Sequence, residues 1–216
     1  MAITMSKPKM LFQFDVDSTF IQQEAIELLA SKAGVLQEVA EITTQAMNGD
    51  IDFAQSLKFR VGLLKGLPVN VIDQVRQEIV LTDGAVELVE YLHSLGHSVS
   101  LVSGGFVQIM QPIVSSLGIK YFRANVLEIQ DGLLTGGVSG AIIDRAAKAQ
   151  ALQEFARLSN VEMNDTVAIG DGANDLDMMA EAGVSIAFNA KPIVVEAADF
   201  SINEPSLRSV TALLGL

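Results

Sequence analysis

Four short apolar runs recur along the chain, and each is followed by a polar loop. They are MLFQF at 10–14, HSVSLV at 97–102, DTVAIG at 165–170 and VSIAF at 184–188. Near-continuous apolar runs of this length are typical of strands that are buried on both faces of a parallel sheet. Between them, apolar residues recur at helical spacing, as across residues 85–95. Strands alternating with helices predict an α/β fold with a doubly wound parallel sheet.

The alternation is interrupted once, between residues 22 and 80. This segment reads as consecutive helices separated by the turns NGD and KGLP. We therefore predict a helical cap domain at 22–80, inserted after the first strand, and an α/β core formed by 1–21 and 81–216. Residues 124–140 predict a β-hairpin that turns at Asp131 and Gly132.

Composition and charge exclude several classes of protein. The formal net charge of −12 disfavours nucleic acid and anionic membranes as partners. The sequence contains no cysteine, which excludes disulfides, thiolate metal sites and cysteine nucleophiles and fits a reducing compartment. No apolar run is long enough to span a bilayer, and the N-terminus lacks the pattern of a signal peptide. We expect a soluble, cytoplasmic protein.

Polar residues follow three of the predicted strands. Asp15 and Asp17 follow the first strand, Ser103 and Gly104 follow the second, and the sequence GDGAND at 170–175 follows the third. In an open α/β sheet, ligands bind at the carboxyl ends of the strands. We therefore expect these residues to form one site.

The paired aspartates have other readings when taken alone. A single D-x-D is equally compatible with a helix cap or an Asx turn. A calcium loop is excluded because Phe20 stands where that loop needs glycine. GDGAND lacks the third glycine of a dinucleotide-binding loop, and Asp171 would repel a pyrophosphate. Two carboxylate-bearing loops at neighbouring strand ends favour a Mg²⁺ site instead.

The choice of nucleophile is narrow. No G-x-S-x-G motif occurs, and the only histidines, His93 and His97, lie at the end of a predicted helix, where last-turn charges or surface positions explain them. An aspartate can form an aspartyl-phosphate. We expect Asp15 to attack phosphorus and Asp17 to act as general acid and base, both on one side of the extended chain. Phosphoryl transfer also needs a cation, for which Lys148 and Arg145 compete.

In this order, DVDST, SGG, a helical lysine and GDGAND resemble the four motifs of the haloacid dehalogenase superfamily. Over nearly the whole chain, the sequence is most similar to the phosphoserine phosphatases within it. Glu24 in STFIQQEAIE and Arg60 in FRVGLLKGLP match that family's cap residues, whereas Phe20 replaces its usual leucine.

The resemblance implies a role for each matching residue. The nucleophile is Asp15, the general acid and base is Asp17, and Mg²⁺ is held by the Asp15 carboxylate, the Asp17 carbonyl and Asp171, with Asp175 supporting the metal shell. Substrate is bound by Glu24, Arg60, Ser103, Gly104, Lys148 and Asn174, and Met47 and Phe53 line the cap pocket. The implied reaction is hydrolysis of L-phosphoserine to L-serine and phosphate, the last step of serine biosynthesis, by a monomer or homodimer.

Other functions remain open at this point. The same chemistry could serve phosphohomoserine or another small phosphorylated metabolite, or transfer the phosphoryl group to an alcohol. A signalling domain that is phosphorylated on Asp15 is disfavoured, because a general base at Asp17 shortens the life of an acyl phosphate. Phosphate release, as against a stable phosphoprotein, separates the two classes.

Overall fold

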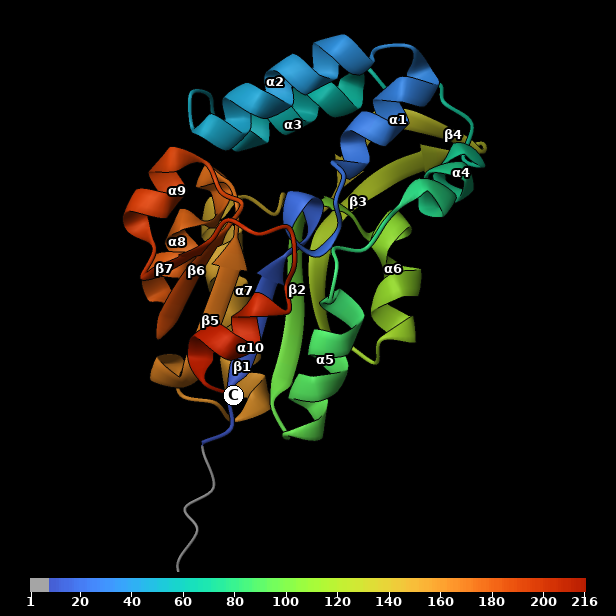
Figure 1. The fold of residues 1–216 in the computed structure, drawn as a ribbon. Helices are drawn as coiled ribbons and strands as arrows, with labels where there is room; N and C mark the ends of the chain where they lie inside the picture. The colour runs from blue at the N-terminus through green and yellow to red at the C-terminus, as the bar shows by residue number, and fades with distance from the viewer. Residues whose placement is uncertain (1–7) are drawn as a thin grey trace, which may run out of the picture.

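A mostly parallel sheet of seven strands forms the centre of the computed structural model, which describes residues 8–216 (Figure 1). The strand order is β4-β3-β2-β1-β5-β6-β7, and only β4 runs antiparallel to its neighbour. The strands are β1 (Leu11–Asp15), β2 (Ser98–Phe106), β3 (Tyr121–Gln130), β4 (Leu133–Ser139), β5 (Thr166–Gly170), β6 (Val184–Phe188) and β7 (Phe200–Ile202). The predicted fold class and hairpin are confirmed. The short strand β7 had no clear apolar run and was not predicted.

Strand β1 lies in the middle of the sheet, hydrogen-bonded to β2 on one side and β5 on the other. Phe12 and Phe14 pack into the apolar cluster on one face, and Leu11 packs into the cluster on the opposite face. All three side chains are fully buried, and burial of each contributes about 1.5–3 kcal/mol. The position of Asp15 at the end of β1 is therefore strongly fixed.

Helices cover both faces of the sheet (Figure 1). None of those within residues 8–216 is long and apolar enough to cross a membrane. The core helices are α5 (Ala85–Ser94), α6 (Val107–Ser116), α7 (Arg145–Ser159), α8 (Leu176–Glu181), α9 (Pro192–Ala197) and α10 (Ser209–Leu214).

Four further helices follow β1 before the core resumes: α1 (Ala25–Ala33), α2 (Leu36–Asn48), α3 (Phe53–Gly62) and α4 (Val71–Glu78). Figure 1 shows α1, α2 and α3 above the carboxyl ends of the strands. The chain leaves and re-enters the core side by side, because Ile21 and Leu81 form an antiparallel bridge. We therefore propose that the cap comprises residues 22–80.

The hairpin of β3 and β4 also contacts the cap. The N–H of Gly66 donates to the carbonyl of Leu134 at 2.8 Å, and the N–H of Leu134 donates to Leu67 at 2.9 Å. The N–H of Val69 donates to Gly132 at 2.9 Å. The loop after α3 thus adds a short paired segment to β4, which would otherwise be an open edge strand.

Substitution of Gly136 tests how closely the hairpin packs on the cap. Gly136 has φ +86°, and a Cβ there would lie 3.0 Å from the Lys65 Cβ. Gly132 has φ +78° with nothing within 4 Å of an added Cβ. Both alanine variants strain the backbone, but Gly136→Ala also overpacks. We expect it to lower the free energy of unfolding by about 1–3 kcal/mol more than Gly132→Ala in urea denaturation. Equal losses would contradict the packing.

Candidate active site

The first strand ends at Asp15, and Val16–Phe20 then forms a tight turn, η1. The expectation that strand alternation positions Asp17 on the same side as Asp15 is therefore wrong. The turn and two hydrogen bonds place it instead. Asp17 Oδ1 accepts from the N–H of Ala25 at 2.7 Å, and Oδ2 accepts from Ser103 Oγ at 2.8 Å. One carboxylate thus joins the first residue of a cap helix to the carboxyl-terminal part of β2, because Ser103 and Gly104 lie within β2 and not, as predicted from the sequence, in a loop after it.

Lys148 is the cation at the centre of the site. Its side chain is completely buried, and its Nζ donates to Asp15 Oδ1 at 2.5 Å and to Asp175 Oδ1 at 2.7 Å. Arg145, the competing candidate, instead forms an exposed ion pair with Asp177 at 2.6 Å. The geometry therefore favours Lys148 as the cation that faces the reacting group.

Gln13 holds the lysine helix against β1 and was not recognised from the sequence. Its Nε2 donates to the carbonyl of Lys148 at 3.1 Å and contacts Met178 Sδ at 3.3 Å. The side chain is fully buried. A polar residue in the middle of an otherwise apolar strand was the available signal, because buried polar groups need partners.

Three carboxylates converge beside Lys148. Asp15, Asp171 and Asp175 each place an oxygen within 4.8 Å of the others, and all three are buried. Burial and then the Asp175 carboxylate raise the pKa of Asp15 well above its usual range, against the effect of Lys148. The same influences raise the pKa of Asp171 to about 7. Crowded carboxylate oxygens of this kind suit a hard divalent cation, whose charge would offset the repulsion.

The carboxyl-terminal part of β2 is held by Asn125 of β3, a second residue that was not recognised from the sequence. Asn125 Nδ2 donates to the carbonyl of Gly104 at 2.8 Å, and its Oδ1 accepts from the N–H of Ile143 at 2.9 Å. Ser103 Oγ accepts from the N–H of Gly105 at 2.7 Å. The side chain of Asn125 gave no local signal, since its partners lie about 20 residues away on either side in the chain.

The cap contributes a carboxyl group, that of Glu24, and a guanidinium, that of Arg60. Glu24 accepts from Ser18 Oγ at 2.7 Å, and burial and then the charge of Asp17 raise the pKa of Glu24 to about 8. Arg60 is only 2% exposed, and its hydrogen bonds go to Ser56 and Thr43. Within residues 8–216 it forms no direct ion pair with a carboxylate. A buried cation without a direct counter-ion is costly, which points to an anionic ligand.

These groups surround one small cavity of about 20 Å³, roughly the space of one water molecule. Its lining includes Asp15, Asp17, Glu24, Met47, Phe53, Arg60, Gly104 and Asn174. Four predicted residues lie outside this lining. Ser103 donates to Asp17 and Lys148 donates to Asp15, both of which line the cavity. Asp171 and Asp175 each place an oxygen within 4.8 Å of an Asp15 oxygen. The buried Oδ1 of Asn174 has no hydrogen-bond partner within the described chain. The cavity therefore offers the unused acceptor of Asn174 as well as the Glu24 carboxyl group and the Arg60 guanidinium.

The cap is closed over this cavity. A Cβ added to Gly104 would lie 2.5 Å from the Phe53 ring, so α3 packs directly on the carboxyl-terminal part of β2. Asp15 and Asp17 are 3% and 8% exposed. A substrate can reach them only after the cap moves away from the core.

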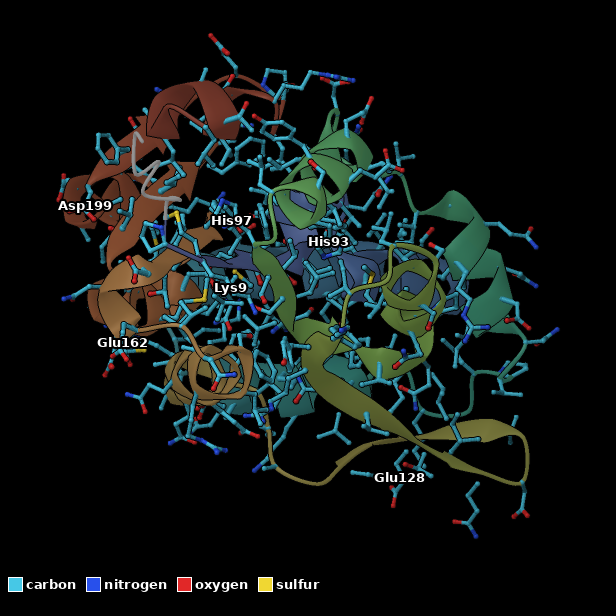
Figure 2. The ribbon with its side chains drawn as sticks, turned by 90° about the horizontal axis from the view of Figure 1, so that it is seen from below. Lys9, His93, His97, Glu128, Glu162 and Asp199 are labelled. Carbon is cyan, nitrogen blue, oxygen red and sulfur yellow. The ribbon has the colours of Figure 1, made fainter. Side chains whose placement is uncertain are left out.

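Both histidines lie at the opposite end of the sheet, as the view from below shows (Figure 2). His93 is exposed in the last turn of α5, as predicted. His97 is only 7% exposed, and its Nδ1 accepts from the N–H of Met10. Its interpretation as a surface or last-turn residue is therefore wrong: it is a buried structural residue, and neither histidine takes part in the site.

Comparison with known proteins agrees with this geometry. The sequence matches the haloacid dehalogenase-like hydrolase family over residues 12–180. A solved phospho-aspartyl intermediate analogue of a phosphoserine phosphatase superposes with a TM-score of 0.93 and is 43% identical, covering 96% of this chain and 99% of its own. The chain belongs to the haloacid dehalogenase-like hydrolases, and it has phosphoserine phosphatases among its relatives.

Two of those relatives differ in length. The phosphoserine phosphatase of Streptococcus thermophilus is 48% identical over 97% of this chain and 98% of its own length. That of Streptomyces coelicolor is 53% identical over 95% of this chain but only 50% of its own length. The chain thus spans about half of the Streptomyces protein and nearly all of the Streptococcus protein.

Removing the ammonium of Lys148 should destabilise the fold. Lys148→Met leaves Asp15 and Asp175 buried without their partner, and we expect a loss of about 3–5 kcal/mol in the free energy of unfolding. Arg145→Met, on the same helix, removes an exposed pair and should cost less than about 1 kcal/mol. Urea unfolding in metal-free buffer at neutral pH measures both. Similar losses for the two variants would contradict the central position of Lys148.

Proposed function

We propose that this chain hydrolyses L-phosphoserine to L-serine and phosphate through an aspartyl-phosphate on Asp15. The observation that carries the proposal is that one closed cavity has the predicted phosphate-binding residues of the core at one end and polar cap residues at the other. At the core end, Lys148 and a carboxylate cluster face the nucleophile. At the cap end, Arg60 is buried and has no direct ion-pair partner among residues 8–216, and Glu24 lies in the same cavity.

The first half-reaction begins at Asp15. One of its carboxylate oxygens attacks phosphorus, and the bond from phosphorus to the serine oxygen breaks. Asp17 donates a proton to that leaving oxygen. This assignment is supported by the raised pKa of Asp17, which burial causes although the hydrogen bonds from Ala25 and Ser103 oppose it. The product is serine and a phosphorylated Asp15.

The second half-reaction restores the enzyme. Asp17, now a carboxylate, takes a proton from water as that water attacks phosphorus. The bond from phosphorus to the Asp15 oxygen breaks, and phosphate leaves. The hydrogen bonds to Asp17 from Ala25 and Ser103 hold the carboxylate in place through both steps.

Mg²⁺ is the cation we propose for the carboxylate cluster, with Asp15 and Asp171 as carboxylate ligands, the Asp17 backbone carbonyl as a third, and Asp175 supporting the shell. When bound, it supplies positive charge to the phosphate oxygens. Lys148 supplies a second positive charge from the protein itself. Ser103 and the backbone at Gly104 complete the phosphate-binding group.

Recognition of the amino acid falls to the cap. Arg60 can bind the substrate carboxylate bidentately, and Glu24 can pair with the ammonium. The unused acceptor of Asn174 offers a further polar contact. The names of the relatives support the choice of phosphoserine, because the relatives match over most of this chain, including the cap. Phosphohomoserine and other small phosphorylated metabolites are the alternatives that a substrate panel must exclude.

The test is phosphate release with Mg²⁺ from L-phosphoserine, D-phosphoserine, phosphohomoserine, phosphothreonine and p-nitrophenyl phosphate. We expect kcat/KM for L-phosphoserine to exceed the others by at least about a hundredfold, because buried polar groups reject ligands that leave them unpaired. Arg60→Ala should raise KM for phosphoserine far more than for the aryl phosphate. Hydrolysis of the aryl phosphate without preference for phosphoserine would refute phosphoserine as the substrate but would leave the proposed mechanism at Asp15 standing.

Asp15→Asn provides the mechanistic control in the same assay. It should abolish turnover of every substrate, whereas activity above about a tenth of wild type would refute the covalent mechanism.

Metal binding has a readout that does not depend on activity. The raised pKa values of Asp15 and Asp171 mean that, without metal, the cluster favours the folded state most at low pH and loses that contribution as the pH rises through about 7. Protons also compete with the metal. The increase in Tm on adding Mg²⁺ should therefore be larger at about pH 8 than at about pH 5.5, and Asp171→Asn should remove most of it. An increase that does not depend on pH would contradict the site.

A further inference from the structure

The guanidinium of Arg60 is held by two hydroxyl groups from the cap helices. Its Nη1 donates to Thr43 Oγ1 at 2.9 Å, and its Nη2 donates to Ser56 Oγ at 3.4 Å. Its Nε donates to the carbonyl of Ser56 at 3.3 Å. Thr43 comes from α2, whereas Arg60 and Ser56 come from α3, so the closer hydroxyl contact joins two different helices.

Each hydroxyl is oriented as an acceptor by its own helix. Thr43 Oγ1 donates its proton to the carbonyl of Val39 at 2.9 Å, and Ser56 Oγ donates to the carbonyl of Phe53 at 2.8 Å. A hydroxyl has a single proton to donate, so both oxygens present lone pairs to Arg60. Thr43 and Ser56 are each only 3% exposed, which keeps water from replacing them.

The remaining donors of Arg60 define what it can bind. A guanidinium has five N–H groups, and the three hydrogen bonds above use one on each nitrogen. One N–H on each terminal nitrogen is left within the described structure. Arg60 also lines the cavity, so two N–H groups, one on each terminal nitrogen, are available to a carboxylate bound there.

We propose that Thr43 is a positioning residue that sets the preference for an amino-acid carboxylate by fixing the rotation of the Arg60 guanidinium, with Ser56 as the weaker second support. This inference rests on the proposed function, since it deepens the role given to Arg60. Without the Thr43 hydroxyl, Arg60 retains its charge but its Nη1 loses a fixed direction. Binding of the carboxylate then has to order the side chain as well.

The adjacent threonine provides a matched control. Thr44 lies on the same helix, and its Oγ1 donates to the carbonyl of Ala40 at 3.0 Å, the same local bond that Thr43 makes. Thr44 is exposed and does not contact Arg60. Thr43→Val and Thr44→Val therefore remove the same atom from the same helix, and only the first removes a bond to Arg60.

The experiment measures kcat and KM of the Mg²⁺-loaded enzyme for L-phosphoserine and for p-nitrophenyl phosphate. Thr43→Val should raise KM for phosphoserine by about 10- to 100-fold, the usual effect of losing a hydrogen bond to a charged group. The aryl phosphate has no carboxylate, so its KM should change by less than about threefold. Thr44→Val should leave both close to wild type, and Thr43→Ser, which keeps the hydroxyl, should restore most of the affinity for phosphoserine.

A double-mutant cycle separates this role from general damage to the cap. In an Arg60→Ala background, Thr43→Val should have no further effect on phosphoserine. Equal losses for both substrates, or a full additional loss in that background, would overturn the proposal and assign Thr43 a structural role. If wild type itself shows no preference for phosphoserine, the proposed function fails. If Arg60→Ala loses the preference and Thr43→Val does not, only the inference about Thr43 fails.

Discussion

The ammonium of Lys148, completely buried between Asp15 and Asp175, is the interaction on which the rest of the site depends. Burial alone lowers the pKa of a lysine, but here the two carboxylates outweigh it and raise the pKa of Lys148 above its usual value. The lysine therefore stays charged, and it makes a cluster of buried aspartates tolerable. Gln13 fixes the helix that carries it to the central strand. One cation thus positions the nucleophile and limits the repulsion around it.

The cap is joined to the same machinery through Asp17. Its carboxylate accepts the N–H of Ala25, the first residue of α1, so the general acid and base of the proposed reaction is held by a bond that crosses from core to cap. Phe53 closes over Gly104 in the same way. Opening of the cap to admit substrate must stretch or break these contacts. In the proposed reaction, the catalytic geometry is therefore complete only in the closed state, and closure limits the access of water while Asp15 attacks the substrate phosphorus.

The sequence predicted what depends on local pattern and failed where distant contacts decide. Apolar runs located β1, β2, β5 and β6, and Asp131 with Gly132 located the hairpin, because strand and turn signals are local. The polar residues after three predicted strands were enough to expect that they form one site. It did not reveal Asn125, whose carboxamide holds the carbonyl of Gly104 from a different strand, or the burial of His97. Thr43 and Thr44 are indistinguishable by residue type, and only the packing of α2 on α3 decides which one meets Arg60.

The division of labour between core and cap explains why recognition and chemistry need each other. The core residues are fixed by a central strand that is buried on both faces, so their arrangement changes little with the substrate. Arg60 and Glu24 lie on the element that has to move. In the proposed function, binding energy that they gain from the amino-acid end of a substrate stabilises the closed cap, in which the Ala25 N–H donates to Asp17. A phosphate ester that lacks this end would bind the core equally well but would stabilise closure less. Removing the amino-acid end from a substrate should therefore lower kcat as well as raise KM.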